Sequence, residues 1–328
     1  MANILKTKYE VLLCTSDSKN IKTSNFKKIN ISFPSSLKDF LNLKKIIISI
    51  IQINKLIKYN SQDIIFCHTP VASHLVRLAT FFKKPKIIYF VHGFRFNDSR
   101  NSLINYFFKI IELILSKNTT GYISINNSDF KFIKKVIKKP AIKINGVGLD
   151  KKNYKIRKRK NKSIFSIGMI GAYKKNKGYD SIINNINAIT GFIPNIKINA
   201  YGYGSSRKFK NLIIKKKINK FKLNKFTNNI IQKIVNFDVL LHPSFREGLP
   251  VSIMQSLQYS IPVIARNIVG NKDLIKNNYN GFLFNSNKEM IKQLIILYLN
   301  KKLRIQFSNN ASKSITPEYL KPFVNAKI

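Results

Sequence analysis

Short strand-like runs alternate with longer helical runs along this chain, and this alternation limits the possible folds more than any other feature. The strand-like runs are apolar on both faces, as in "DIIFCH" (63–68) and "KIIYFVHG" (86–93). Such strands are typical of parallel sheets that helices cover on both sides. The first half of the chain therefore predicts strands at 9–16, 63–68, 86–93 and 121–126, and helices at 43–59, 73–82 and 102–117.

The same alternation restarts after a polar, cationic stretch, "KKNYKIRKRKNK" (151–162), which has no apolar period and indicates a domain boundary. Two doubly wound α/β halves joined by a linker would place a ligand cleft at the carboxyl ends of two sheets. The second half predicts strands at 163–171, 197–204, 237–244 and 261–265, a turn at 277–284, and helices at about 178–189, 250–259 and 288–299.

At 328 residues the chain is long enough for two domains of ordinary size. No apolar run approaches the roughly 18 residues that a membrane span needs. The start, "MANILKTKYEVLLCTSD", lacks the features of a secretory signal, so we expect a cytoplasmic protein. Cys14 and Cys67 lie far apart without metal-ligand spacing, and we assign them no chemistry.

The charge is extreme, because 59 Lys plus Arg against 14 Asp plus Glu give a net charge of +45. Such a charge attracts nucleic acid, an anionic membrane face or a phosphorylated substrate. The basic residues are scattered and accompany a heavy use of Asn and Ile, as compositional drift in an AT-rich genome would also produce. Drift and a real anionic partner both stay open. The best candidate partner is the cytoplasmic membrane surface, where each nearby Lys or Arg contributes about 1 kcal/mol.

The densest motif is "HPSFREGLPVSIMQSLQYSIPVIA" (242–265). We expect Pro250 to be the first helical residue, since proline lacks the amide hydrogen that would be unpaired there. A helix start beside Gly248 suits a phosphate. A phosphate would repel Glu247 unless that carboxylate binds sugar hydroxyls, which are natural donors to it. The motif therefore predicts a site for a phosphorylated sugar, and a solvated Glu247 that caps the helix is the alternative.

A longer stretch, "REGLPVSIMQSLQYSIPVIARNIVGNKDLIKNNYNGFLF" (246–284), strongly resembles the donor-binding region of family 4 glycosyltransferases, which have the GT-B fold. "DIIFCHTPVASHLVRLA", "VHGFRF" and "INGVGLD" resemble segments of bacterial polysaccharide members, so the matches run in order over nearly the whole chain. The resemblance implies two doubly wound, Rossmann-like domains facing each other across a cleft. These would be an acceptor-side domain at 1–150, a basic linker at 151–162, a donor-binding domain at 163–310, and a terminal segment at 311–328 that packs back toward the amino-terminal domain.

The resemblance also implies roles for individual residues. Glu247 would hold the hydroxyls of the donor sugar, and Lys177 in "YKKNKGYD" would neutralise the leaving diphosphate in place of a metal. His92 in "VHGF" would lie beside the reacting carbon. Position 255 would bind the ribose. The implied donor-binding residues are Gly248, Leu249, Pro250, Gln255, Gly171 and Gly204.

The other three histidines receive no chemical role. His68 in "CHTP" is expected to shape the wall of the cleft. His74 lies in a helical pattern and His242 lies before a proline, and neither is assigned a function.

Three departures from the family pattern favour an alternative without activity. Gln255 stands at the second acidic position of the pattern, where it gives up a charge-assisted hydrogen bond. Ala172 stands where the family usually has arginine. The first strand-loop-helix unit of the amino-terminal domain is expected to be shortened to "MANILKTK".

The leading interpretation is a retaining, metal-independent hexosyltransferase that needs no cofactor. It would move a sugar from a nucleotide-diphosphate donor, expected to be a UDP-sugar, to a lipid-linked or surface-polysaccharide acceptor of the kind used in lipopolysaccharide biosynthesis. We expect it in the cytoplasm, peripheral on the inner face of the cell membrane. One alternative is a catalytically impaired relative in a glycan pathway. A basic nucleic-acid-binding protein is the remaining alternative, and the dispersion of the charge disfavours it.

Overall fold

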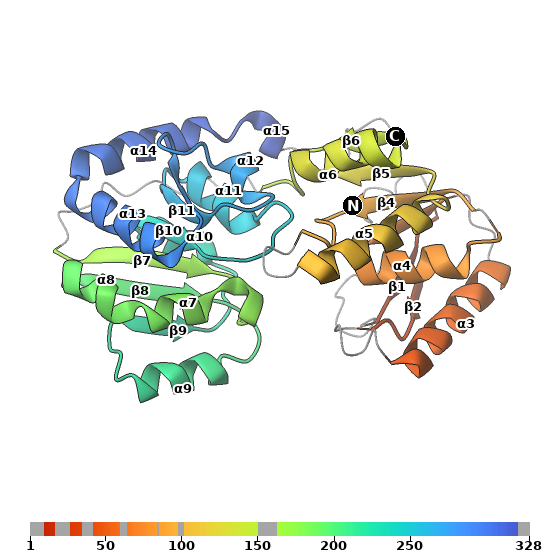
Figure 1. Ribbon diagram of the computed structural model, residues 1–328, viewed down its shortest axis with the longest axis horizontal. Coiled ribbons are helices and arrows are strands. Elements are labelled where there is room, and N and C mark those ends of the chain that lie inside the picture. The colour runs from red at the N-terminus through yellow and green to blue at the C-terminus, as the bar shows by residue number, and fades with distance from the viewer. Residues whose placement is uncertain are drawn as a thin grey trace. The chain divides into compact units, whose positions relative to one another are not determined.

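The fold is described from a computed structural model (Figure 1), which describes residues 10–16, 27–34, 42–59, 64–83, 85–97, 102–149 and 163–320. These residues form two compact units. Unit 1 holds the described residues from 10 to 147 except Asn97, and unit 2 holds Asn97 and those from 148 to 320. The start "MANILKTK", the basic linker at 151–162 and the tail at 321–328 lie outside the described residues, so the proposed domain boundaries stay a prediction.

Unit 2 is built on six parallel strands in the order β12-β11-β10-β7-β8-β9. The strands are β7 (Phe165–Ile170), β8 (Ile196–Tyr201), β9 (Phe221–Asn224), β10 (Val239–His242), β11 (Val263–Arg266) and β12 (Gly281–Phe284). The helices are the 3-10 turn η2 (Lys175–Lys177), α7 (Tyr179–Asn184), α8 (Ile186–Phe192), α9 (Arg207–Lys215), α10 (Ile230–Ile234), α11 (Val251–Gln258), α12 (Asn271–Leu274), α13 (Asn287–Leu299), α14 (Lys301–Lys313) and α15 (Pro317–Leu320).

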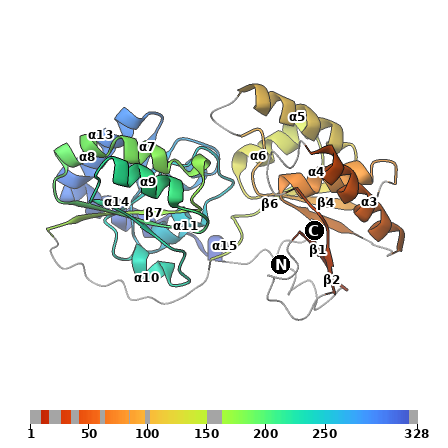
Figure 2. The ribbon, with the colours of Figure 1, turned by 90° about the horizontal axis from the view of Figure 1, so that it is seen from below.

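Helices cover both faces of this sheet, with α7, α8, α9 and α13 on one side and α10 and α11 on the other (Figure 2). The central strand β10 is buried along its whole length, which is why its sequence is apolar on both faces. Residues from strands and covering helices form one core, including Ile167, Ile183, Leu241 and Leu294. The predicted doubly wound α/β architecture is confirmed for this unit.

Unit 1 has a four-stranded parallel sheet in the order β3-β4-β5-β6. Within the described residues, β1 and β2 pair in parallel as a separate two-stranded sheet. The strands are β1 (Leu12–Thr15), β2 (Lys27–Asn30), β3 (Ile65–His68), β4 (Ile87–Val91), β5 (Gly121–Ser124) and β6 (Ala141–Lys143). The helices are α3 (Leu43–Tyr59), α4 (Pro70–Ala79), α5 (Ser102–Ser116), α6 (Asn127–Phe132) and the π-helical turn η1 (Ile133–Ile137).

Several predicted elements have different bounds in the structure. The helix expected at 73–82 begins at Pro70, because proline fits the first helical turn, where its missing amide hydrogen is not needed. The helix expected at 178–189 is divided into α7 and α8 at Asn185. The Asn185 side chain donates to the Ser181 carbonyl oxygen at 2.8 Å, and such local bonds compete with a continuous helix.

The sequence patterns missed several short or polar elements. Short elements with few apolar residues, such as β2 (KKIN) and α6 (NSDFKF), carry too little apolar pattern to be recognised. The missed elements are β2, α6, η1, β6, η2, α9, β9, α10, α12, α14 and α15, and the segment expected to be a turn at 277–284 ends in strand β12.

A buried ion pair connects α4 to α5 in unit 1. Arg77 donates to both carboxylate oxygens of Glu112, at 2.6 and 3.0 Å, and His74 Nε2 lies 3.1 Å from Glu112 Oε2. All three side chains are buried, and the Arg77 guanidinium also lies over the ring of Tyr89. Burial alone would raise the pKa of Glu112, but Arg77 and His74 hold it below its usual value. His74 therefore helps to hold α4 against α5.

We expect Glu112→Ala to lower the free energy of unfolding by about 3–5 kcal/mol, because it leaves the Arg77 charge buried and unpaired. The exposed-site control Glu318→Ala should cost less than about 1 kcal/mol. Urea denaturation followed by circular dichroism measures both changes. Equal, small effects of the two substitutions would contradict the buried pairing.

Candidate donor site in unit 2

The predicted phosphate loop lies between the end of β10 and the start of α11. Pro250 has φ −73° and ψ 118° and is the residue before the helix, so the expectation that it is the first helical residue is wrong by one position. Its extended ψ excludes it from the helix, and Val251 is the first helical residue. Pro250 provides no side-chain cap for this helix start. The amino end of α11 therefore keeps the partial positive charge that attracts an anion.

The backbone of this loop is packed tightly against a glycine turn. Gly270 has φ +83°, and a Cβ at this position would lie 2.2 Å from the Gly248 carbonyl oxygen. Any side chain at residue 270 would therefore push the 248–250 backbone away. Leu249 and Pro250 are buried, whereas Gly248 is partly exposed.

Glu247 is the centre of a three-residue cluster. Its Oε1 atom accepts a hydrogen bond from Lys177 Nζ at 2.5 Å and lies 3.0 Å from His242 Nε2. Burial opposes ionisation of Glu247, but His242 and Lys177 together lower its pKa to about 2. The carboxylate is thus ionised at neutral pH and held by two partners. The alternative of a solvated Glu247 that caps the helix is wrong, since its side chain is only 11% exposed.

Two loops that are far apart in sequence bring Lys177 to Glu247. Lys177 ends η2, directly before Gly178, which has φ +73° and would clash with the Pro243 carbonyl oxygen if it carried a Cβ. The Phe245 amide donates to the Asn176 carbonyl oxygen at 2.9 Å, which ties the same two loops together. The position of the Lys177 ammonium group is therefore set by backbone packing at the carboxyl ends of β7 and β10.

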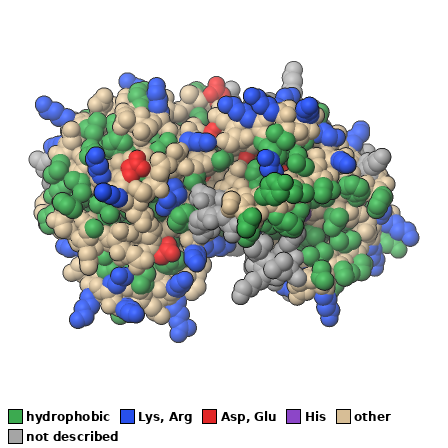
Figure 3. Space-filling model, in the orientation of Figure 1, with side chains coloured by type: hydrophobic (Ala, Val, Ile, Leu, Met, Phe, Trp, Pro, Cys, Tyr) green, Lys and Arg blue, Asp and Glu red, His purple; other side chains and the backbone are tan. Residues whose placement is uncertain are grey.

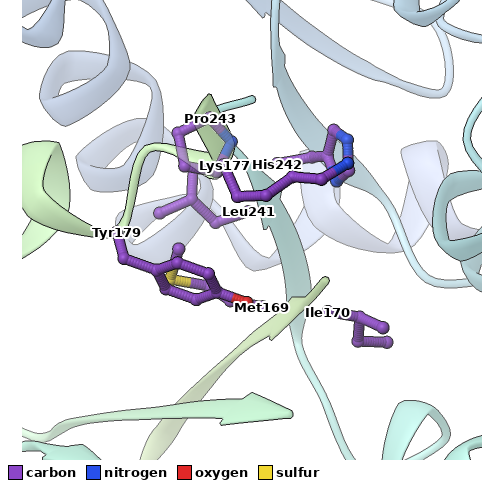
Figure 4. Close-up of a pocket in the computed structure, with 7 residues that line it drawn as sticks. All are labelled: Met169, Ile170, Lys177, Tyr179, Leu241, His242 and Pro243. Atoms are coloured by element: carbon purple, nitrogen blue, oxygen red, sulfur yellow. The ribbon is translucent and has the colours of Figure 1, made fainter. Parts of the chain in front are cut away.

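A small pocket lies beside this cluster (Figure 4). Tyr179 is buried at the start of α7, and its hydroxyl donates to the Gly171 carbonyl oxygen at 2.6 Å. Gly171 is also close to Lys177, because a Cβ there would lie 3.6 Å from Lys177 Cδ. The lining residues are Met169, Ile170, Lys177, Tyr179, Leu241, His242 and Pro243.

The remaining donor-site residues do not join this cluster. Gly204 has φ +87°, is exposed, and would place a Cβ in open space. Gln255 is partly exposed on α11, and its side chain makes no hydrogen bond with the residues that the structure describes. Ala172 is buried, and its methyl side chain supplies no cation beside the loop.

His242 was missed by the sequence reasoning, which gave it no role because it precedes a proline. It is buried at the end of β10 and contacts the Glu247 carboxylate. The available signal was its place at the carboxyl end of a buried strand, five residues before the loop carboxylate.

Unit 1 brings two of its histidines together. His68 is the last residue of β3 and His92 directly follows β4, and His68 Nδ1 lies 3.1 Å from His92 Nε2. Both rings stack on Phe90. Burial, and then the neighbouring His68, lower the pKa of His92 to about 4, and burial lowers the pKa of His68. Both imidazoles are therefore neutral at pH 7, and His68 orients the ring of His92.

Comparison with known proteins identifies the family. Residues 150–314 match the family described as "Glycosyl transferases group 1", and residues 1–126 match "Glycosyl transferase 4-like". The chain belongs to the group 1 (family 4) glycosyltransferases. The predicted GT-B fold and the predicted family are both confirmed.

One protein similar in sequence and two similar in structure illustrate the relationship. The UDP-Gal:alpha-D-GlcNAc-diphosphoundecaprenol alpha-1,3-galactosyltransferase of Escherichia coli is 27% identical over 84% of this chain and 76% of its own length. WaaG, a glycosyltransferase involved in lipopolysaccharide biosynthesis, superimposes with a TM-score of 0.70 at 15% identity, over 95% of this chain and 88% of WaaG. TarM of S. aureus, crystallised with UDP, fondaparinux and alpha-GlcNAc-glycerol, has a TM-score of 0.64 at 18% identity, over 84% of this chain. The glycosyltransferase spans 56% of the length of that TarM chain.

We expect the His92 imidazole to titrate with a midpoint near pH 4 in the folded protein. The unfolded chain takes up this proton near pH 6.5, so the free energy of unfolding should decrease as the pH falls from about 6.5 toward about 4. Nuclear magnetic resonance of the histidine side chains, assigned with His92→Gln, measures the midpoint. A midpoint near 6.5 would show that His92 is neither buried nor paired with His68.

Proposed function

We propose that this glycosyltransferase is a retaining, metal-independent hexosyltransferase that uses a UDP-sugar donor. The observation that carries the proposal is the ionised Glu247, held by Lys177 and His242 next to the uncapped start of α11. A cation, a carboxylate and a helix amino end within one loop cluster match the charges and hydroxyls of a nucleotide sugar.

Charge accumulates on the diphosphate when its bond to the anomeric carbon breaks. Lys177 and the backbone amides near Gly248 and Leu249 would stabilise that charge in place of a metal ion. Lys177 would then be shared between the diphosphate and Glu247, whose pKa of about 2 keeps it anionic throughout.

Glu247 would bind the sugar through its second oxygen. Oε1 is engaged by Lys177 and His242, whereas Oε2 has no hydrogen-bond partner among the described residues. That oxygen can accept from the hydroxyls of the donor sugar. His242 would act as a positioning residue that fixes the carboxylate.

The remaining roles follow from the family. Gln255 would accept or donate a hydrogen bond at the ribose, and Gly171, Gly204 and Pro250 would border the donor. For His92 we propose the place that the family implies, beside the reacting carbon of the bound donor. Its lowered pKa keeps it neutral, and because Nε2 faces His68, Nδ1 is the ring nitrogen that would form a hydrogen bond there.

UDP and a lipid-linked acceptor are supported by the relatives. The Escherichia coli relative uses UDP-Gal and a diphosphoundecaprenol-linked acceptor, and TarM was crystallised with UDP. We propose the same donor nucleotide class and a lipid-linked or surface-polysaccharide acceptor for this chain. Such an acceptor would place the enzyme at the cytoplasmic face of the cell membrane.

We expect UDP or GDP to bind the wild-type protein, with micromolar affinity or tighter in isothermal titration calorimetry. Lys177→Ala should weaken nucleotide binding by about tenfold or more, because it removes the cation opposite the diphosphate. Glu247→Ala should leave UDP binding detectable but remove the preference for one UDP-sugar over UDP. Lys210→Ala, an exposed lysine of the same unit, should bind like the wild type.

No nucleotide binding by the folded wild-type protein would favour the alternative of a catalytically impaired relative. The buried Ala172 and the unpaired Gln255 would then explain the loss. Equal binding by Lys177→Ala and Lys210→Ala would contradict the role of Lys177.

A further inference from the structure

Helix α5 has an apolar outer face in addition to its inner one. Its buried residues Phe108, Glu112, Leu115 and Ser116 recur at helical spacing and define the inner face. On the opposite side Leu103 is 83% exposed and Phe107 is 56% exposed. Helices that are apolar all round are normally buried on all sides. The large apolar residues exposed on α5 are Leu103, Ile104, Tyr106, Phe107, Ile110 and Ile114.

The apolar surface continues onto the neighbouring helices. Helix α4 packs against both α3 and α5, and the three helices lie on the same face of the unit 1 sheet (Figures 1 and 2). Apolar side chains gather over this part of unit 1 in Figure 3. The further exposed residues are Leu43, Ile47, Ile48, Ile51 and Tyr59 on α3, Leu78 on α4, and Phe82 in the turn after α4. We call these residues, with those on α5, the α3–α5 surface.

The exposed charged side chains described on these helices are all positive. Among the described residues of α3, α4, α5 and the turns that follow α4 and α5, Glu112 is the sole acidic residue, and it is buried against Arg77. The exposed cations are Lys44, Lys45, Lys55, Lys58, Lys83, Lys109 and Lys117. A partner of the α3–α5 surface must therefore accept apolar side chains and lysines at the same time.

We infer that the α3–α5 surface docks on an anionic lipid bilayer. Leucine, isoleucine and phenylalanine side chains would enter the boundary between headgroups and acyl chains, and the lysines would reach the lipid phosphates. Tyr59 and Tyr106 suit the same boundary, because their rings are apolar and their hydroxyls are polar. Within the described residues no helix is long and apolar enough to cross a bilayer.

Charge distinguishes the bilayer from a second copy of this chain. A two-fold symmetric dimer would place this surface, whose exposed charged side chains among the described residues are all lysines, against a copy of itself, and such like charges repel. An anionic bilayer neutralises them, and each lysine near its surface strengthens binding about fivefold.

The inference goes beyond the proposed sugar transfer, because it assigns a surface in unit 1 that takes no part in the donor site. It is consistent with a lipid-linked acceptor but does not depend on one. Vesicle binding tests it without nucleotide or sugar, so its failure is distinguishable from failure of the nucleotide-binding test.

The first experiment compares matched triple variants of the full chain. Leu103→Ser, Phe107→Ser and Ile114→Ser together remove the outer face of α5. Leu299→Ser, Phe192→Ser and Ile305→Ser together remove side chains of the same types and similar exposure from unit 2.

Co-sedimentation with vesicles of phosphatidylglycerol and phosphatidylcholine measures binding. We expect the α5 variant to bind about tenfold more weakly than the wild type, and the unit 2 variant to bind like the wild type. Binding of the wild type should weaken with phosphatidylcholine alone and in about 0.5 M salt.

A fluorescence probe locates the contact and keeps the inference testable if the triple variant does not fold. The chain contains no tryptophan, so a single Phe107→Trp substitution gives one reporter on α5. We expect its emission to shift to the blue, and to be quenched by brominated lipids, when anionic vesicles are added. Phe192→Trp, a similarly exposed site in unit 2, should show neither effect.

Three results would overturn the inference. The wild type could fail to bind anionic vesicles, or the α5 variant could bind them as well as the wild type does. Sedimentation velocity could instead show a dimer that the α5 variant abolishes while vesicle binding persists. That last result would assign the α3–α5 surface to a second copy of the chain.

Discussion

Parallel pairing of the strands is the constraint on which both units of this glycosyltransferase depend. Every strand in a parallel sheet ends at the same edge, so residues that directly follow neighbouring strands are brought together. His68 ends β3 and His92 directly follows β4, and these two strands pair with each other. Lys177 and Glu247 lie in the loops after β7 and β10, which also pair. Strand pairing in the sheets thus brings together side chains from distant parts of the sequence.

The Glu247 cluster shows how the protein holds a carboxylate where burial opposes charge. Desolvation favours the protonated acid, yet His242 and Lys177 reverse the effect and lower the pKa to about 2. The same balance operates in unit 1, where Arg77 and His74 keep the buried Glu112 ionised. In the first case the charge faces a loop with an uncapped helix start, and in the second it joins two helices. A buried carboxylate held by a histidine and a cation thus occurs in both units, in a loop in unit 2 and between two helices in unit 1.

The family relationship and the surface chemistry point in the same direction. The Escherichia coli relative is a galactosyltransferase with a diphosphoundecaprenol-linked acceptor, and we propose an acceptor of this kind for the present chain. The exposed apolar and lysine-rich face of α3, α4 and α5 is suited to a bilayer that carries such an acceptor. Part of the +45 net charge then has a local use, although drift remains a sufficient origin for the lysines scattered elsewhere.

The sequence by itself determined the fold class and the order of the main strands and helices. The spacing of apolar residues and the length of each apolar run are local properties of the sequence, and they indicate helix or strand. It also pointed to Glu247, Lys177 and His92 through motifs resembling those of the family. Only the tertiary structure decided that His242 contacts Glu247, that His68 pairs with His92, and that Pro250 lies outside the helix. It alone showed that α5 buries its one acid and exposes its apolar side chains. Contacts across loops and the choice of buried face depend on packing between distant segments, which no local pattern encodes.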